Sequence, residues 1–356
     1  MKTAIVGLPM TGKTSLFTIL TGVHEATRVG SMEARVGVTK VPDPRLDALA
    51  RIFQPPKVTH ATIEFLDFPS ISKEALANPQ YLASMRVADA IAHVVRVFQS
   101  DTVPHEKGDV DPIRDIQDVD AELSLSDLVV VEKRLERLEK ERKKIKSAEL
   151  DREAELLVEA KARLEANEPL RGWKLDPAGE KLLRGFQFLS QKPMLYVLNL
   201  GEEDASKLND VEESFRRKLA SRAGAEVTAV CGKIEAELAE LSPDEAAEYL
   251  ASYGLPGSGL DRLVHASYRL LGLMSFLTAG ETEVRAWTVP IGSTAVKAAG
   301  AIHTDFEKKF IRAEVVHWEQ LVSAGGYAGL RDKGQLRLEG KEYIVKDGDV
   351  LVIRHG

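Results

Sequence analysis

The residues best suited to chemistry lie near the start of the chain, where residues 7–15 read GLPMTGKTS. This is the GxxxxGKT pattern of a phosphate-binding loop. Gly7 and Gly12 let the backbone curl so that successive N–H groups point at phosphate oxygens. Lys13 supplies a positive charge to the outer phosphates, which also makes it a catalytic candidate, and the hydroxyl of Thr14 suits a magnesium ion. The predicted contacts of this loop are Gly7, Pro9, Met10, Thr11, Gly12, Lys13, Thr14 and Ser15.

Two elements must hold this loop in place. An apolar strand is expected at residues 3–6, and residues 15–20 have the apolar spacing of a helix. The amino end of that helix adds a favourable dipole to an anion site. A loop between a strand and a helix therefore favours phosphate binding over the alternative, a glycine-rich turn with a solvated lysine.

Further candidates follow the next two strands. Residues 36–41 read as a strand that ends at a proline, and the polar stretch before it is expected to form a loop beside the phosphates. Ser31 in this stretch is a candidate magnesium ligand, although serines in loops are usually only solvated. A strand at residues 62–66 ends on Asp67, which in this class of fold lies near the metal and holds its water shell. An aspartate after a strand is also a common helix cap.

Three more apolar strands are expected, at residues 90–98, 193–198 and 226–230. Apolar strands separated by helical segments predict an α/β fold with a doubly wound, mostly parallel sheet. Ligand-binding residues of such sheets gather at the carboxyl ends of the strands. The predicted nucleotide contacts at these ends are Asn199, Glu202, Cys231, Gly232 and Lys233, and the aliphatic stem of Lys233 is expected to pack over the base.

An insertion of different character separates two of these strands. Its apolar residues follow the three-then-four spacing of a heptad seam on both sides of a break near Ser147. Two such helices joined by a short turn should pair antiparallel as a projecting hairpin. The outer faces are densely charged, which is usual for a solvated, salt-bridged helix but also compatible with binding a partner or RNA. The positions assigned to the seam are Leu128, Val131, Leu135, Leu138, Arg142, Ile145, Leu150, Ala154, Leu157, Lys161 and Leu164.

Short strands take over near the end of the chain. They are expected at residues 283–289, 310–316, 335–339, 342–345 and 350–354, and a helix is expected at 294–303. The Asp347-Gly348 pair predicts a tight hairpin between the last two strands. The predicted division is a nucleotide-binding domain at 1–120 and 191–277, a helical hairpin at 121–190 and a small α+β domain at 278–356. The last domain shows no nucleophile or metal cluster and reads as a binding module.

Composition narrows the class of protein. The 356 residues are 44% hydrophobic, which is enough for a large core and for two or three domains. No apolar run is long enough to span a bilayer, and the start of the chain lacks the features of a signal peptide. The single cysteine fits a reducing cytosol, so we expect a cytoplasmic protein. The net charge of -7 argues against a protein whose whole surface binds nucleic acid, although local basic patches stay compatible with it. We expect no DNA partner, and contact with RNA or the ribosome is neither required nor excluded.

Several long stretches carry a resemblance to a known family. They are VPDPRL at 41–46, DAIAHVVR at 89–96, VEKRL at 131–135, KIEAEL at 233–238, AGETEVRAWT at 279–288 and AGAIHTDFEK at 299–308. In this order, behind the phosphate-binding loop, they resemble the YchF-type, Obg-like ATPases over essentially the whole chain. The resemblance implies a nucleotide-binding domain interrupted by a helical hairpin and followed by a β-grasp module of the TGS kind. It also implies an Mg2+-dependent ATPase that accepts GTP and associates with the ribosome.

The resemblance assigns roles to three residues. The family's NxxE pattern matches at Asn199 and Glu202, where it is linked to the use of ATP. GTPases of this fold normally have an aspartate three residues after the asparagine, where Glu202 stands here, and it accepts from both guanine N–H donors. The longer arm of a glutamate cannot be assumed to reach them. We therefore expect ATP to be preferred to GTP. The family's loop histidine, implicated in hydrolysis, corresponds to His105, the best candidate for orienting the attacking water.

Two departures from the family bear on turnover. Met10 stands where the family usually has an asparagine that helps to hold a monovalent cation, so potassium stimulation is not expected. The family's DxxG element becomes Asp67-Phe68-Pro69-Ser70, which lacks a glycine N–H for the terminal phosphate and restricts motion of the loop. The leading expectation is an ATPase with slow hydrolysis. The alternatives are a nucleotide-binding adaptor that never turns over and a true GTPase.

Overall fold

The computed structural model describes residues 1–24, 32–332 and 334–356. The chain forms two compact units. The first unit comprises Met1–Gly37 and Glu64–Leu270, and the second comprises Val38–Ile63 and Leu271–Gly356. The second unit therefore includes a segment from the first fifth of the chain, which was not predicted. Ser31, the predicted metal ligand, lies outside the described residues.

The sheet of the first unit has the strand order β2-β4-β1-β5-β6-β7. The pairings β1 with β4, β1 with β5, β5 with β6 and β6 with β7 are parallel, which confirms the predicted parallel-rich α/β sheet. Phosphate-loop and strand-end candidates therefore emerge at one edge of it. The strands are β1 (Lys2–Val6), β2 (Arg35–Lys40), β4 (Thr62–Asp67), β5 (Ala90–Arg96), β6 (Met194–Asn199) and β7 (Ala225–Val230).

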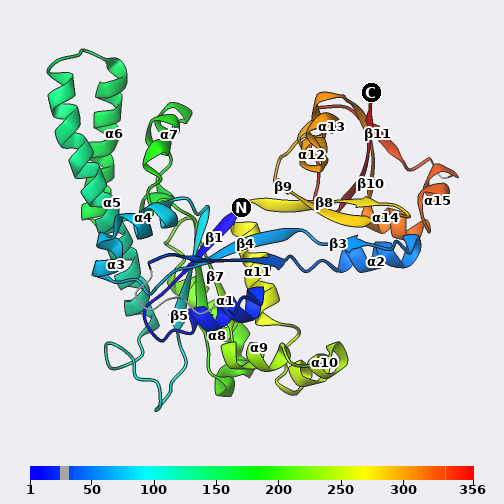
Figure 1. The fold of residues 1–356 in the computed structure, drawn as a ribbon, viewed down its shortest axis with the longest axis horizontal. Helices are drawn as coiled ribbons and strands as arrows, with labels where there is room; N and C mark the ends of the chain where they lie inside the picture. Colours follow the sequence, from blue (N-terminus) through cyan, green and yellow to red (C-terminus); the bar gives the residue numbers. More distant parts are fainter. Residues whose placement is uncertain (25–31, 333) are drawn as a thin grey trace. The chain divides into compact units, whose positions relative to one another are not determined.

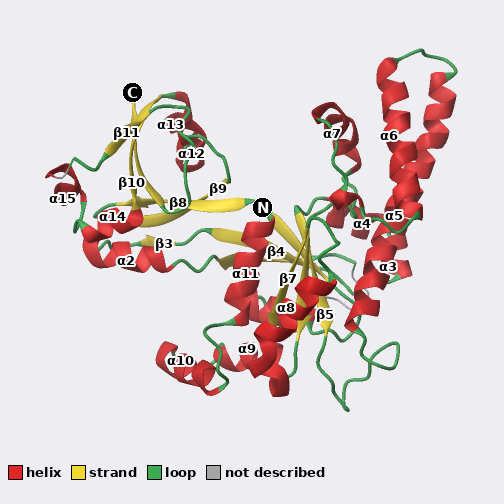
Figure 2. Ribbon diagram, turned by 180° about the vertical axis from the view of Figure 1, so that it is seen from behind, coloured by secondary structure: helices red, strands yellow, loops and turns green. Residues whose placement is uncertain are grey.

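Helices lie against this sheet (Figures 1 and 2), and the contacts are made by buried apolar side chains. One core cluster joins alternate residues of β5, β6 and β7 to Met85, Val119 and Phe215 on three different helices. The remaining strand residues point to the other face, where α11 packs. The helices of the first unit outside the hairpin, not all of which contact the sheet, are α1 (Lys13–Thr21), α3 (Lys73–Ala77), α4 (Pro79–Arg86), α7 (Pro177–Leu183), α8 (Leu208–Lys218), α9 (Gly232–Leu238), α10 (Pro243–Ser252) and α11 (Gly259–Leu270).

The helical hairpin consists of α5 (Pro112–Arg142) and α6 (Ala148–Glu165), which run antiparallel (Figure 1). Its seam buries Val131, Leu138 and Leu157, as the heptad spacing predicts, whereas Ile145 is exposed in the turn. The helix starts earlier than the predicted insertion at 121. Its first turns pack on the sheet and its later turns pack on α6, so one continuous helix carries the hairpin.

The second unit is built on a sheet with the order β11-β10-β12-β8-β9-β3. The predicted hairpin between residues 342–345 and 350–354 is wrong: Ile344 forms only an isolated bridge with Thr294, while β12 pairs with β10 and β8. The Asp347-Gly348 turn has a different use, because Asp347 accepts from Ser275 N at 3.0 Å. The strands are β3 (Val58–Thr59), β8 (Leu273–Ala279), β9 (Val284–Pro290), β10 (Phe310–His317), β11 (Arg337–Glu339) and β12 (Asp349–His355).

Residues 38–63 join this unit through α2 (Pro44–Phe53) and β3. Helix α2 begins at Asp43, whose carboxylate accepts from Arg45 N at 3.1 Å. Its apolar face buries Leu46 and Leu49, and β3 pairs parallel with β9. The other helices of the unit are α12 (Ala295–Ile302), α13 (Thr304–Lys308), α14 (Trp318–Ser323) and α15 (Tyr327–Asp332). Among the described helices of both units, none is long and apolar enough to cross a membrane.

Candidate nucleotide-binding site

The phosphate loop connects β1 to α1, and neighbouring atoms leave no room for a side chain at either of its two glycines. A Cβ atom on Gly7 would lie 2.7 Å from the carbonyl oxygen of Val94. Gly12 has φ 87°, a left-handed conformation that side chains avoid, and a Cβ there would lie 2.5 Å from Nδ2 of Asn199. Only glycine fits at either position. Helix α1 begins directly afterwards at Lys13, so the amino end of the helix faces the loop.

The other loop residues divide by exposure. Thr11 is buried and its hydroxyl donates to the carbonyl oxygen of Leu8 at 3.1 Å, so its side chain stabilises the loop. Met10 has φ 58° and is 64% exposed, so its thioether points away from the loop's interior. Pro9 is partly exposed at the turn, and Ser15 lines the cavity described below.

Lys13 contacts the segment that replaces DxxG. Its ammonium donates to the hydroxyl of Ser70 at 3.1 Å, and burial lowers its pKa although the nearby carboxylate of Asp67 opposes this effect. Pro69 is held in turn, because the hydroxyl of Tyr81 donates to its carbonyl oxygen at 3.2 Å. Ile71 N donates to Gly7 O at 3.0 Å. The segment is thus fastened to the phosphate loop at both of its ends.

The predicted metal ligands Thr14 and Asp67 lie together. The Thr14 hydroxyl donates to Oδ2 of Asp67 at 3.3 Å, and Oδ1 of the same carboxylate is buried without a hydrogen-bond partner. A hydroxyl and an unsatisfied carboxylate oxygen are hard donors of the kind that Mg2+ takes in nucleotide sites. Within the described parts of the chain no cluster of three or more His, Cys, Asp or Glu side chains offers a metal site of its own. The residues present therefore fit a magnesium ion shared with phosphates.

Asn199 joins two loops of the site. Its Nδ2 donates to the carbonyl oxygen of Thr11 at 3.0 Å, and its Oδ1 accepts from Gly232 N at 3.0 Å. The side chain is therefore held between the phosphate loop and the loop after β7. Because the residue is 5% exposed, both hydrogen bonds are shielded from water.

Glu202 lies at the far end of the same site and its carboxylate is already occupied. Oε1 accepts from the hydroxyl of Tyr253 at 2.5 Å, and Oε2 accepts from the ammonium of Lys233. Both interactions lower the pKa of Glu202. The predicted packing of the Lys233 stem over the base stays a prediction; its ammonium contacts Glu202, and the residue lines the cavity described next.

These residues surround one cavity of about 450 Å³. It extends from the phosphate loop at Gly12 to the pair of Glu202 and Lys233, which matches a ligand with phosphates at one end and a base at the other. Cys231, a predicted nucleotide contact, does not line this cavity. Its side chain is fully buried beside Ala205, and burial raises the pKa of its thiol. The lining residues that sequence reasoning missed are Ile19, Phe98, Gln99, Ser100, Leu200, Gly201, Glu203 and Ala236. Three of these follow β5 and three follow β6, so the rule that ligands bind at strand ends could have found them.

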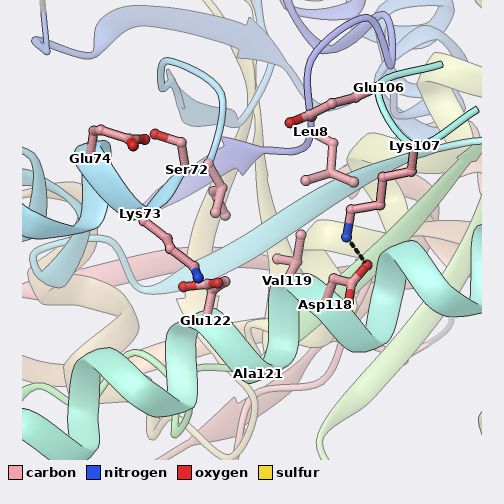
Figure 3. Close-up of a pocket in the computed structure, with 11 residues that line it drawn as sticks. Leu8, Ser72, Lys73, Glu74, Glu106, Lys107, Asp118, Val119, Ala121 and Glu122 are labelled. Atoms are coloured by element: carbon pink, nitrogen blue, oxygen red, sulfur yellow. Dashed lines mark hydrogen bonds and ion pairs between the residues drawn. The ribbon is translucent and has the colours of Figure 1, made fainter.

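His105 is buried away from that cavity. Its Nε2 lies 2.9 Å from Oδ2 of Asp115 on α5, and its Nδ1 accepts from Lys107 N at 3.1 Å. Both ring nitrogens are therefore engaged within the protein. Lys107 makes a second contact with α5, at 2.5 Å from Asp118, and Figure 3 shows this pair on one side of a cavity that Leu8 of the phosphate loop also lines. The histidine loop thus lies beside the phosphate loop but is fastened to α5.

Comparisons with known proteins agree with this geometry. Residues 2–134 match a family model described as a 50S ribosome-binding GTPase, and residues 273–356 match the YchF-GTPase_C model, described as a protein of unknown function. The ribosome-binding ATPase YchF of Pasteurella multocida is 43% identical over 99% of this chain and 98% of its own length. That of Bacillus subtilis is 43% identical over 98% of each chain. The solved structure of the Schizosaccharomyces pombe YchF GTPase has a TM-score of 0.85 and 28% identity over 99% of this chain and 97% of that chain. The phosphate-binding fold and this likeness along the whole length show that the chain belongs to the YchF family of Obg-like P-loop proteins.

Proposed function

We propose that this protein is a cytoplasmic, magnesium-dependent ATPase of slow turnover that acts on the ribosome. ATPase activity and ribosome binding are named for its bacterial relatives, and the phosphate loop supports the first of them here. In this proposal the loop amides and Lys13 bind the phosphates, and Thr14 and Asp67 hold the metal. Magnesium, when bound, neutralises phosphate charge during cleavage. A Lys13→Ala variant that kept full affinity for ATP would contradict these roles.

The observation that carries the preference for ATP is the occupied carboxylate of Glu202. Guanine offers two N–H donors on one edge, and a free carboxylate accepts both of them. Here both oxygens of Glu202 already accept, from Tyr253 and Lys233. Guanine would have to share these oxygens with the two donors already bound to them, whereas adenine does not present that pair of N–H groups. ATP is therefore favoured over GTP by a cost imposed on guanine.

Competition titration tests this preference. ATP and GTP displace a fluorescent ATP analogue from the wild-type protein in the presence of magnesium, and ATP is expected to compete at the lower concentration. Tyr253→Phe removes one donor from Glu202 and should shift the ratio of affinities toward GTP. Tyr327→Phe is the matched control, because that hydroxyl donates to the carbonyl oxygen of Ala279 in the second unit rather than to Glu202. Tighter binding of GTP than of ATP by the wild-type protein would support a true GTPase instead.

A non-hydrolysing adaptor is the second candidate, and the position of His105 favours it. Both ring nitrogens are engaged by Asp115 and Lys107, so orienting a water requires the loop to leave α5. Hydrolysis is then limited by the population of that open loop. A single-turnover assay at saturating ATP and magnesium separates the two functions. Product above the background of a Lys13→Ala sample supports the ATPase, and its absence despite full binding supports the adaptor.

The tip of the hairpin supports contact with ribosomal RNA. Lys140, Lys144 and Lys146 are exposed there, close to the turn between α5 and α6. Exposed lysines bind phosphate groups in a salt-dependent manner. Replacing all three with glutamate should weaken cosedimentation with ribosomes and reduce its dependence on salt. Lys181→Glu on α7 is the control, since it changes the charge of an exposed lysine outside the tip.

A further inference from the structure

A cation supplied by the chain itself lies at the proposed metal site. Arg35, at the start of β2, donates to Oδ2 of Asp67 from Nη2 at 2.5 Å and from Nε at 3.2 Å. The two side chains are 12% and 5% exposed, so water screens their charges only weakly. The same oxygen accepts from the Thr14 hydroxyl. The guanidinium therefore binds the carboxylate that is expected to hold the water shell of magnesium.

The surroundings keep Arg35 at this position. Its guanidinium lies 5.0 Å from the centre of the Phe17 ring on α1, which is a cation–π distance. A planar guanidinium with two contacts to one carboxylate is more strongly fixed than a lysine ammonium would be. β2 is the edge strand of the sheet and lies next to β4, which ends on Asp67. Arg35 therefore reaches the carboxylate from the neighbouring strand.

The net charge of the side chains beside the phosphates becomes positive because of this residue. Without Arg35, Asp67 and Lys13 would carry no net charge together, and the Asp67 carboxylate would be left to bind a divalent cation. With Arg35 bound to Asp67, the three side chains carry a net positive charge. The positive charge of Arg35 also helps to lower the pKa of Lys13, although burial is the larger cause. The site thereby attracts phosphate anions and repels a free metal ion.

We propose that Arg35 is a resident cation of the phosphate site that partly replaces magnesium. The inference rests on the proposed function, because it concerns the same phosphates. Arg35 neutralises Asp67, so the carboxylate draws a metal less strongly, and it contributes positive charge to a triphosphate that carries no metal. Both effects act in the same direction. The protein should bind ATP almost as well without magnesium as with it.

The test is the ratio of two dissociation constants for a fluorescent ATP analogue, one measured in EDTA and the other in excess magnesium. For the wild-type protein the ratio should stay below about tenfold. For Arg35→Gln it should rise by about tenfold or more, since an unpaired buried carboxylate now favours the metal and the metal-free triphosphate loses a positive partner. Mn2+ binding followed by electron paramagnetic resonance should tighten in the same variant.

Arg262→Gln is the matched control, because it breaks another partly buried arginine–carboxylate pair of the first unit, with Glu212. Its ratio should equal that of the wild-type protein. An unchanged ratio in Arg35→Gln would overturn the inference while leaving ATP binding intact. If that variant fails to fold, the wild-type ratio still decides, since a value above about a hundredfold would also overturn it. No binding of the analogue by the wild-type protein under either condition would refute the proposed function itself.

Discussion

Replacing Asn199 with alanine should weaken binding of the phosphates as well as the base. The side chain makes two shielded hydrogen bonds, to Thr11 O and from Gly232 N, each 3.0 Å long. A neutral hydrogen bond contributes about 1 kcal/mol net, so both together contribute about 2 kcal/mol to holding the two loops. If roughly two thirds of that appears in ligand binding, affinity falls by about tenfold. The remainder appears as lower stability.

Isothermal calorimetry with two ligands separates positioning of the loop from contact with the base. ATP and inorganic tripolyphosphate are titrated in turn, both with magnesium. Since tripolyphosphate has no base, its affinity should fall by the same factor as that of ATP if Asn199 acts through the phosphate loop. Asn199→Asp keeps the acceptor for Gly232 N but places an oxygen against Thr11 O, so it should be at least as damaging as alanine. Unchanged tripolyphosphate affinity beside weakened ATP affinity would refute this reasoning.

Three other perturbations have defined outcomes. Gly7→Ala places a methyl group 2.7 Å from Val94 O, which should lower the stability of the first unit by about 1–3 kcal/mol in denaturant titrations and weaken tripolyphosphate binding; stability equal to the wild type would be contrary to this fit. His105→Ala should slow single-turnover cleavage of ATP by about tenfold or more at unchanged affinity, and an unaltered rate would remove His105 from the reaction. Burial lowers the pKa of His93 from 6.5 to about 4, so as the pH falls between these values the unfolded chain takes up a proton that the folded chain does not, and stability is lost. Relative to His93→Leu, the wild type should therefore lose about 2.5 kcal/mol between pH 7 and pH 4.5, and parallel pH profiles of the two proteins would count against this cause.

The sequence was most informative where chemistry and spacing are local. The phosphate loop is contained in nine consecutive residues, and the six strands of the first sheet are apolar runs bounded by turns, so both could be predicted. The fold class alone predicted that Thr14 and Asp67 both lie near the metal, and in the structure their side chains are in contact. The heptad spacing likewise predicted most of the residues that α5 and α6 bury against each other. However, Arg142 and Ile145 of the predicted seam are exposed, and the buried Leu156 and Ala160 were missed.

Long-range partners were not available from the sequence. Nothing near Arg35 indicates that its partner is 32 residues away, and nothing near Glu202 points to Tyr253, 51 residues further on. His105 looks like a solvated loop histidine because its buried partner lies on the following helix. β3 has two residues and no pattern of its own, so its pairing with β9 could not be foreseen, and residues 38–63 were assigned to the wrong unit.

The composite origin of the second unit limits how the protein can be divided into fragments. The polypeptide passes between the two units three times, after Gly37, after Ile63 and after Leu270. Removing everything from residue 271 onward would strip β3 of its strand partner and uncover the apolar face of α2, with Leu46 and Leu49 exposed to solvent. The truncated first unit would carry this exposed apolar surface on residues 38–63, the segment that leads into β4 and Asp67. Aggregation or lost activity of such a fragment would then be caused by residues 38–63, which lack their packing partners. A fragment that also lacks residues 38–63 is the better test of what the first unit does alone.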